Sequence, residues 1–327
     1  MRRVSSFTKV HWLDLRGHGI SAIERLLLEE FLLRHDTRSW AIVGTHEPLG
    51  HRFLTTTTTS KSRESNSFDP SCIIVMGIGG KPEKLLNIPK VKEDGIMVIK
   101  RFSGGGTVVL DPNSIWTTWI GRTSHFPEVD PYPRSIMDWS SSTAFQSVFD
   151  KLKEESLQIP LRGPKTLVIE SKSCGATDSV GTLSLGTPLS NATTRLDIPN
   201  FTLRENDYVL GEKKVGGNAQ SIVKDGWLHH TSFLWDYDPD NMSYLTLPTK
   251  RPQYRGDRDH TDFLVKLKDI YPGLTIGSFF KALKSESETK FDLQVVNLPE
   301  VTSQIESQFD SLQTWFDTKS RTRIIDL

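Results

Sequence analysis

Residues 100–111 read Lys-Arg-Phe-Ser-Gly-Gly-Gly-Thr-Val-Val-Leu-Asp, and this stretch carries the most structural information in the chain. Glycine adopts backbone conformations closed to other residues and lets a ligand approach the main chain closely. The apolar run that follows, residues 107–110, predicts a strand entered from a glycine loop. Lys100 and Arg101, beside exposed backbone N–H groups, would suit phosphate or carboxylate oxygens. The alternative is a tight hairpin with a glycine bulge and no ligand.

Two further stretches lie downstream of this loop. Residues 211–220 read Gly-Glu-Lys-Lys-Val-Gly-Gly-Asn-Ala-Gln, and residues 227–235 read Trp-Leu-His-His-Thr-Ser-Phe-Leu-Trp. Each motif alone is weak, but their order and spacing are specific. Together they resemble the lipoate–protein ligase A family, part of the biotin/lipoate ligase superfamily, over residues 10–258.

The expected fold class is α+β, with a mixed, largely antiparallel sheet flanked by helices. The resemblance implies the class II synthetase-like catalytic domain of biotin and lipoate ligases over residues 10–258. A threonine run at 55–59 predicts a polar loop insertion at about 47–70. A change in pattern near Arg258 predicts a small C-terminal α/β subdomain over residues 259–327.

The resemblance also implies a reaction. An ATP-dependent ligase of this family activates lipoate, or octanoate, as an acyl-adenylate and transfers the acyl group to a lysine of a lipoyl domain. The implied partners are apo lipoyl domains of 2-oxoacid dehydrogenase complexes or the glycine cleavage H protein. The implied cofactors are ATP and Mg²⁺, the latter carried mainly by the phosphates and water.

The chemistry of such a reaction requires a fixed cation, because the acid oxygen and the α-phosphate that it attacks are both negative. Lysine supplies a compact point charge. Lys213 and Lys214 are both candidates, and strand alternation allows only one of them to face a pocket. The resemblance points to Lys214 as the catalytic residue, because the family's essential lysine begins the corresponding motif.

The resemblance extends to residues that would bind substrate or ATP. Arg101 would hold phosphate oxygens, and the glycine loop would approach the acyl and phosphate groups. Asn113, in a shortened Asp-Pro-Asn motif, would contact the nucleotide. The full predicted set is Arg101, Ser103, Gly104, Gly105, Gly106, Asn113, Gly77, Gly216, Gly217, Asn218, Ala219 and His230. Residues 77–82 lack the Gly-Lys-Ser/Thr ending of a Walker motif.

Histidine and cysteine suggest alternative chemistry. Adjacent strand residues point to opposite faces, so His229 and His230 are expected to form no metal site, and one of them is expected to be buried and hydrogen-bonded near the active site.

An octanoyl or lipoyl transferase would use a thiol nucleophile and an acyl donor such as acyl carrier protein. Both cysteines, Cys72 and Cys174, precede Lys214, whereas the transferase thiol follows the lysine motif. A non-catalytic lipoate-binding protein is a third possibility.

Composition narrows the class of protein. The chain has 327 residues, a formal net charge of zero and two cysteines. A nucleic-acid-binding protein usually has a basic excess, and two cysteines cannot build a disulfide framework. No apolar run approaches the ~20 residues that span a membrane. We therefore expect a soluble intracellular protein, cytoplasmic or mitochondrial, that binds neither nucleic acid nor membrane. The basic, serine-containing start could be the stub of a presequence, but acidic Asp14 follows soon after it.

Periodicity predicts the remaining elements. A capping box formed by Ser21 and Glu24 starts the clearest helix, at 21–34, whose buried face carries Ile23, Leu26, Leu27 and Phe31. Other helices are expected at 136–152, 261–271, 276–284 and 300–316. Strands are expected at 39–45, 72–76, 96–99, 107–110, 115–120 and 292–297, with successive strands over 207–235. A strand pair with a long loop is expected within 163–199.

Overall fold

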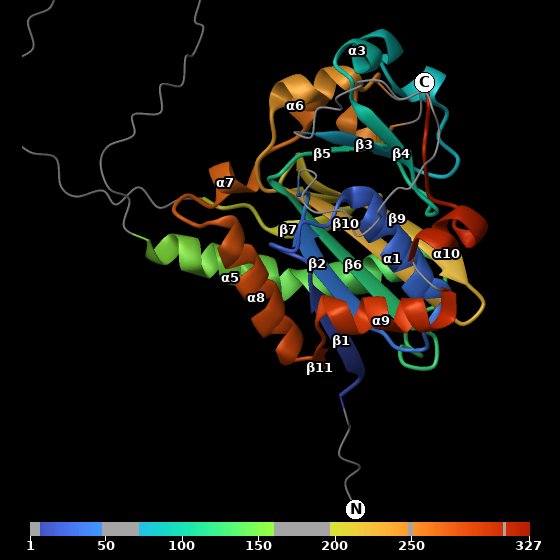
Figure 1. Ribbon diagram of the computed structural model, residues 1–327. Coiled ribbons are helices and arrows are strands. Elements are labelled where there is room, and N and C mark those ends of the chain that lie inside the picture. The colour runs from blue at the N-terminus through green and yellow to red at the C-terminus, as the bar shows by residue number, and fades with distance from the viewer. Residues whose placement is uncertain (1–6, 48–71, 160–196, 248–250, 310–311) are drawn as a thin grey trace, which may run out of the picture.

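The computed structural model describes residues 7–47, 72–159, 197–247, 251–309 and 312–327 (Figure 1). Most of the predicted insertion at 47–70, and most of the predicted strand pair within 163–199, lie outside these residues. Cys174 is outside them as well.

An eight-stranded sheet forms the centre of the fold. Its strand order is β11-β1-β2-β6-β10-β9-β8-β7. The pairs β11–β1 and β1–β2 are parallel, and the other neighbours are antiparallel. The expected mixed, largely antiparallel sheet is thereby confirmed. The strands are β1 (Lys9–Asp14), β2 (Trp40–Thr45), β6 (Ser114–Arg122), β7 (Phe201–Arg204), β8 (Asp207–Leu210), β9 (Lys213–Val223), β10 (Gly226–Leu234) and β11 (Asp292–Val295).

A second sheet of four strands carries the segments on either side of the glycine loop. Its order is β12-β4-β3-β5, with bounds β12 (Arg323–Ile324), β4 (Met97–Lys100), β3 (Ile73–Met76) and β5 (Val108–Leu110). One face of β3 and β4 shares a core with α1 (Ala22–His35) and the large sheet. The other face packs against α3 (Ile88–Glu93) and the 3₁₀ helix η2 (Pro239–Tyr244).

Helix α1 begins with the predicted capping box. The Ser21 hydroxyl accepts from the Glu24 backbone N–H, and the Glu24 carboxylate accepts from the Ser21 backbone N–H. Periodicity predicted one buried face, but residues 22–33 are all buried, including Arg25, Glu29 and Glu30. The reason is that the large sheet, the small sheet and the C-terminal helices all pack around α1.

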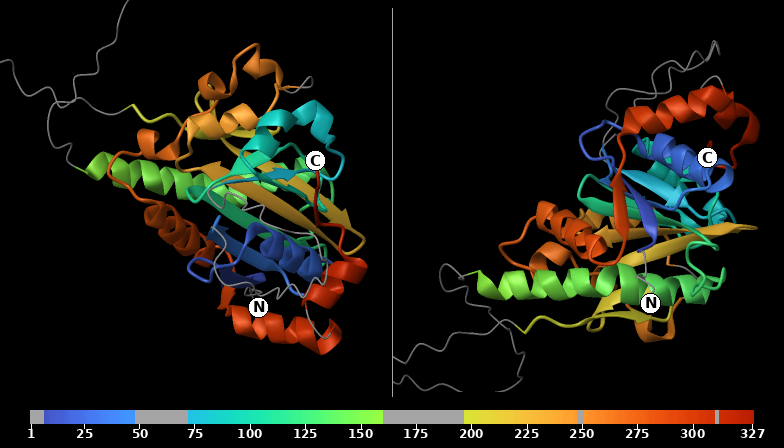
Figure 2. Two further views of the ribbon diagram at one scale, coloured as in Figure 1. Left: turned by 45° about the horizontal axis from the view of Figure 1, so that its top comes forward. Right: turned by 90° about the horizontal axis from the view of Figure 1, so that it is seen from below.

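A second layer of helices covers the opposite face of the large sheet (Figure 2). The single helix predicted over 136–152 consists of α4 (Pro133–Trp139), a π-helical turn (Ser140–Phe145) and α5 (Gln146–Gln158). In the π turn the Ser140 hydroxyl lies 2.5 Å from the Tyr208 hydroxyl. Helix α8 (Ile276–Glu288) packs beside α5.

One other predicted helix is interrupted within the described residues. The segment predicted at 261–271 forms α6 (His260–Phe263) and α7 (Leu267–Ile270), because residues between them bridge to strand β9: the Val265 N–H donates to the Lys214 carbonyl oxygen. The segment predicted at 300–316 is described as α9 (Leu298–Phe309) and α10 (Leu312–Lys319), with residues 310–311 outside the described residues. Short helices α2 (Pro82–Leu85) and η3 (Gln253–Arg255) complete the set.

The segment predicted as a C-terminal subdomain, 259–327, contributes to both sheets. Its strand β11 pairs with β1, and its strand β12 pairs with β4. Trp315 is fully buried, and its ring packs edge-on against Phe31 of α1. A boundary at residue 258 stays a prediction.

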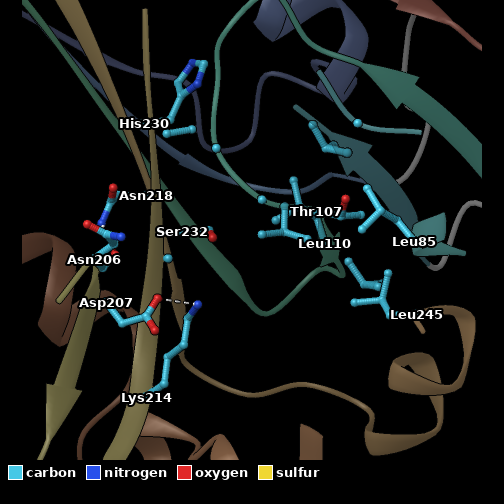
Figure 3. Close-up of a pocket in the computed structure, with 18 of the residues that line it drawn as sticks. Leu85, Thr107, Leu110, Asn206, Asp207, Lys214, Asn218, His230, Ser232 and Leu245 are labelled. Carbon is cyan, nitrogen blue, oxygen red and sulfur yellow. Dashed lines mark hydrogen bonds and ion pairs between the residues drawn. The ribbon is translucent and has the colours of Figure 1, made fainter. Parts of the chain in front are cut away.

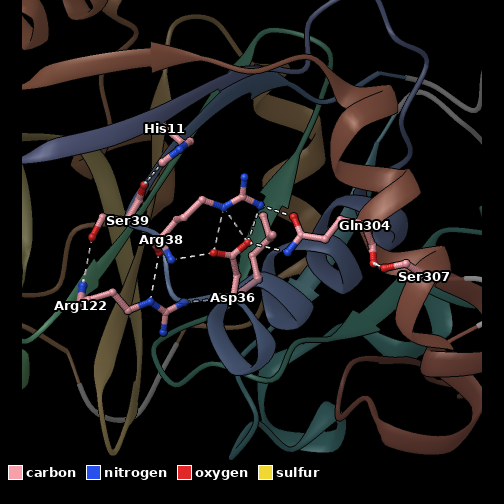
Figure 4. Close-up of polar contacts among 8 residues, drawn as sticks. His11, Asp36, Arg38, Ser39, Arg122, Gln304 and Ser307 are labelled. Atoms are coloured by element: carbon pink, nitrogen blue, oxygen red, sulfur yellow. Dashed lines mark hydrogen bonds and ion pairs between the residues drawn. The ribbon is translucent and has the colours of Figure 1, made fainter.

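A polar cluster joins the C-terminal end of α1 to strands β2 and β6 and to helix α9 (Figure 4). The Arg38 side chain holds the Asp36 carboxylate at 2.6 Å and also donates to Gln304. Arg122 donates to the carbonyl oxygens of Leu32 and Leu33 at 2.7 and 2.9 Å. These carbonyls belong to the last turn of α1, where the helix runs out of backbone donors. The Leu32 oxygen also accepts from the Asp36 backbone N–H at 3.2 Å.

Candidate active site

A cavity of about 910 Å³ lies between the two sheets (Figure 3). Its apolar part is lined by side chains of the small sheet and of the segments packed on it, namely Val75, Leu85, Leu110, Met242 and Leu245. Its polar part lies over β8 and β9 and includes Asn206, Asp207, Lys214 and Asn218. One cavity therefore offers an apolar compartment and a polar one to the same ligand or pair of ligands.

Lys214 faces this cavity. Its Nζ lies 2.6 Å from Asp207 Oδ1, and the lysine side chain is about one quarter exposed. The Tyr254 hydroxyl donates to the other carboxylate oxygen of Asp207 at 2.9 Å. Burial, followed by the charge of Asp207, raises the pKa of Tyr254, so this hydroxyl keeps its proton. The Asp207 carboxylate thus fixes the Lys214 ammonium group, and the Tyr254 hydroxyl holds that carboxylate in turn.

Lys213 points elsewhere. Its Nζ donates to the Asp262 carbonyl oxygen on α6, and the residue does not line the cavity. The alternation expected for adjacent strand residues therefore separates the two lysines.

The glycine loop reaches the cavity through its second and third glycines. Gly105 has φ +98°, a conformation that L-residues with a side chain rarely adopt. A Cβ atom built on Gly105 would stand 3.0 Å from the Asn218 carbonyl oxygen. A Cβ on Gly77 would stand 2.2 Å from the Gly105 carbonyl oxygen, so Gly77 lets the two loops meet.

Arg101 is buried beneath this loop. Its guanidinium donates to the carbonyl oxygens of Gly104 and Gly106 at 2.9 and 2.8 Å, to the Val75 carbonyl oxygen and to the Ser103 hydroxyl. Burial lowers the pKa of Arg101 to about 10, which leaves it charged at neutral pH. The guanidinium therefore organises the loop and adds a positive charge to the cavity, which it lines.

Both adjacent histidines of β10 are buried, on opposite faces of the sheet. His230 lies against the cavity, with Nε2 2.7 Å from Glu29 Oε2 and Nδ1 3.1 Å from the Ser103 hydroxyl. His229 contacts the Tyr208 hydroxyl and the Gln220 amide instead. Within the described residues, no group of three or more His, Cys, Asp or Glu side chains could hold a metal ion.

The remaining predicted site residues divide into two groups. Gly217, Asn218 and Ala219 line the cavity on β9. The following do not line it: Ser103, Gly104, Gly77, Gly216 and Asn113. Ser103 is buried behind the loop, Gly216 packs under the Phe233 ring, and Asn113 is an exposed turn residue.

Sequence reasoning missed several polar residues that line the cavity, among them Asn206, Asp207, Gln220 and Arg255. A signal for Asp207 existed. The two-residue turn at 211–212 pairs Val209 with Lys214, and alternation along β8 brings Asp207 toward the same face. Arg255 comes from a distant 3₁₀ turn and had no comparable signal. Among the cavity-lining residues five are basic and one is acidic, namely Lys81, Lys84, Arg101, Lys214, Arg255 and Asp207.

Comparison with known proteins gives consistent results. The family profile of the lipoyl protein ligase A/B catalytic domain matches residues 68–155 and 167–288. A Plasmodium falciparum protein named inactive lipoate–protein ligase 2 is 29% identical over 286 residues, which cover 80% of this chain and 66% of that protein. Lipoate-protein ligase A of Blochmanniella floridana is 18% identical over 74% of this chain and 59% of its own length. The chain thus spans less than two thirds of the length of these two relatives.

Three solved structures share the fold. Protein Ta0514 from T. acidophilum, a putative lipoate protein ligase with bound lipoic acid, superposes with a TM-score of 0.57 at 15% identity, covering 94% of this chain and 95% of that one. A lipoate-protein ligase A bound with ATP gives 0.57 at 16% identity, covering 96% and 95%. A bipartite T. acidophilum ligase, described with its E2 lipoyl domain, gives 0.56 at 16%, covering 95% and 93%.

Proposed function

The chain belongs to the lipoyl protein ligase A/B catalytic-domain family, and from this premise we propose that it is an ATP-dependent lipoate–protein ligase. The proposed substrates are lipoate, or octanoate, and ATP. The proposed product is an amide between the acyl group and a lysine of a lipoyl domain.

The observation that supports this proposal is the division of one cavity into an apolar and a basic compartment, with Lys214 in the basic one. An acyl chain gains free energy by leaving water for the apolar compartment. A triphosphate needs several cations, and five basic residues line a cavity in a chain whose net charge is zero. Of two solved structures of the same fold, one holds bound lipoic acid and the other holds bound ATP.

The proposed first step is adenylation. An oxygen of the substrate carboxylate attacks the α-phosphorus, a carboxyl–phosphate bond forms, the bond to the bridging oxygen of the β-phosphate breaks, and pyrophosphate leaves. The Lys214 ammonium stabilises the charge that accumulates around the α-phosphorus. Asp207 and Tyr254 position that ammonium in advance. Mg²⁺ would be carried by the phosphates and water.

The proposed second step is transfer to protein. The ε-amine of an acceptor lysine attacks the acyl carbonyl, AMP leaves with the electron pair of the carboxyl–phosphate bond, and the amine loses a proton. The acceptor would be an apo lipoyl domain of a 2-oxoacid dehydrogenase complex or of the glycine cleavage system. A ligase of the same fold has been described together with its E2 lipoyl domain.

A non-catalytic lipoate-binding function is the second candidate. It is favoured by the similarity to the P. falciparum protein, which is named an inactive lipoate–protein ligase. The thiol-dependent transferase has less support, because Cys72 is buried immediately before β3 and outside the cavity lining, and Cys174 lies outside the described residues.

One experiment separates these functions. Purified protein is incubated with lipoate, Mg-ATP and an apo lipoyl domain, and the acceptor is weighed by mass spectrometry. The ligase adds one lipoyl group only when ATP is present. A transferase instead modifies the acceptor from octanoyl-acyl carrier protein without ATP and loses this activity when both cysteines are replaced by serine. A binding protein retains lipoate in equilibrium dialysis and modifies nothing.

A further inference from the structure

Helix α1 reaches the candidate site through the fully buried carboxylate of Glu29. This group accepts from Arg25 Nε at 2.8 Å, from the Thr118 hydroxyl at 2.7 Å and from His230 Nε2 at 2.7 Å. Burial raises the pKa of Glu29, but the charge of Arg25 and the hydrogen bonds from His230 and Thr118 act in the opposite direction, and the pKa is lowered overall. Glu29 is therefore ionised and only accepts hydrogen bonds.

Because Glu29 only accepts, the hydrogen bonds beyond it have one direction. Burial lowers the pKa of His230, so the ring is neutral and carries one N–H. That N–H must be at Nε2, facing Glu29, and Nδ1 must accept from the Ser103 hydroxyl at 3.1 Å. The Ser103 oxygen in turn accepts from Arg101 Nε at 3.0 Å.

These hydrogen bonds form a relay that runs from Glu29 through His230 and Ser103 to Arg101. The glycine loop lies at the far end of this relay. Arg101 holds the carbonyl oxygens of Gly104 and Gly106, and the Gly104 N–H donates to the Gln220 carbonyl oxygen of β9 at 2.8 Å. The loop is thereby fixed against the strand that carries Lys214. Its placement depends on where Ser103 and Arg101 are held.

We propose that Glu29 is a positioning residue: by accepting the Nε2 proton of His230 it fixes the histidine tautomer, and through Ser103 and Arg101 it holds the 103–106 loop in its ligand-ready geometry beside Lys214. Glu29 does not line the cavity and reaches it only through His230. The inference rests on the proposed function for its kinetic consequences, but the tautomer of His230 is measurable without any activity.

The direct test is Glu29→Gln, because an amide cannot present acceptors on both sides. One side of the native carboxylate faces Arg25 and Thr118, and the other faces His230, so the amide N–H₂ meets a donor wherever it points. Long-range ¹H–¹⁵N spectra, assigned with His230→Asn, should show the Nε2–H tautomer in the wild type and loss of that pure tautomer in Glu29→Gln. Lipoate-dependent pyrophosphate release should fall at least ~10-fold, mainly in kcat, as expected for a misplaced reacting geometry.

Glu30→Gln is the matched control. Glu30 is also a fully buried carboxylate of α1, but it accepts from the backbone N–H groups of Arg321 and Thr322, away from the cavity. This variant should lose stability while its kcat stays within about twofold of wild type and the His230 tautomer is unchanged. An equal kinetic loss in both variants, or an unchanged tautomer in Glu29→Gln, overturns the proposal.

Two further variants keep the test decisive. If Glu29→Gln does not fold because Arg25 loses its counter-charge, Arg25→Met/Glu29→Gln removes both charges together and carries the same expectations.

Ser103→Ala breaks the relay on the other side of His230. It should lower kcat but keep the Nε2–H tautomer, and combining it with Glu29→Gln should add little further loss. Fully additive losses contradict a relay. A wild-type protein without ligase activity overturns the proposed function, and the tautomer measurement then decides this inference alone.

Discussion

The two neighbouring lysines of β9 show what a sequence can and cannot decide for a single residue. Alternation predicted that only one of them faces a pocket, and the resemblance selected Lys214. Lys214 lines the cavity and Lys213 contacts α6. The partner of Lys214 was not predicted. Alternation along β8 indicates the face on which Asp207 lies, but the contact itself depends on strand pairing with an irregular register between Tyr208 and Val209.

Replacing Lys214 by alanine should abolish adenylation and leave the fold intact. The substitution removes a fixed cation, which is worth about 10²-fold or more in rate when charge develops beside it. The measurement is lipoate-dependent pyrophosphate release, with circular dichroism to verify folding. Lys213→Ala is the control and should retain near-normal release. The assignment fails if Lys213→Ala is inactive while Lys214→Ala is active.

Among the three consecutive glycines, only Gly105 has a positive φ. Gly105→Val should therefore reduce adenylation heavily, because a β-branched residue is strained at φ +98° and its Cβ would lie 2.9 Å from Arg101 Nη2. We expect a loss of about 1–3 kcal/mol in the free energy of unfolding, typical of such backbone strain. Gly106→Ala is the control for stability, since a Cβ there meets nothing within 4 Å. Comparable melting temperatures for the two variants would contradict this account.

At the scale of elements, local signals predicted where regular structure begins better than where it is interrupted. The capping box gave the start of α1. The π turn at Ser140–Phe145 and the break between α6 and α7 were not predicted, because both accompany contacts with distant strands, to Tyr208 on β8 and to Lys214 on β9. Periodicity within one segment carries no information on such contacts.

Arg122 of strand β6 holds the C-terminal end of helix α1 by hydrogen bonds. Arg122→Met should remove this donor from both carbonyl oxygens, those of Leu32 and Leu33. The Leu32 oxygen keeps the Asp36 backbone N–H as a donor, so the Leu33 oxygen is the group left unsatisfied, at a cost of about 1–3 kcal/mol. We expect the free energy of unfolding to fall by about 1–3 kcal/mol in urea denaturation, with faster amide hydrogen exchange in the last turn of α1. Arg134→Met, whose ion pair with Asp138 is half-exposed, should cost less than about 1 kcal/mol. Equal losses in the two variants would show that the Arg122 hydrogen bonds stabilise the fold no more than an exposed ion pair does.

At the scale of the whole molecule, the fold class followed from the resemblance, whereas the strand order did not follow from the sequence. Strand β11 pairs with β1 although most of the chain separates them, and β12 completes the small sheet from the other end of the sequence. Pairings over such separations are selected by the packed core and leave no local pattern. Within the described residues, no helix combines the length and apolarity needed to cross a membrane.

Two buried histidines, His229 and His230, dominate the response of the whole molecule to acid. His11 and His260 are half-buried, and His35 is exposed. Burial is the largest cause lowering the pKa of five histidines: His11, His35, His229, His230 and His260. For His229 the value falls to about 3. The unfolded chain, with histidine pKa near 6.5, binds more protons than the folded one below that pH. Stability is therefore complete above about pH 6.5 and is lost as the pH falls toward the folded values.

The test is urea denaturation at pH 7.5, 6.5, 5.5 and 4.5. His229 alone should contribute a loss of up to about 1.4 kcal/mol per pH unit below 6.5, because one titrating group with a strongly lowered pKa gives that slope. His229→Gln should be less stable at pH 7.5, since it loses the bond to the Tyr208 hydroxyl, but its free energy of unfolding should change less with pH. His18→Gln, at an exposed position, should keep the wild-type slope. A free energy of unfolding that is flat from pH 7.5 to 4.5 would mean that these histidines are not held neutral by the fold.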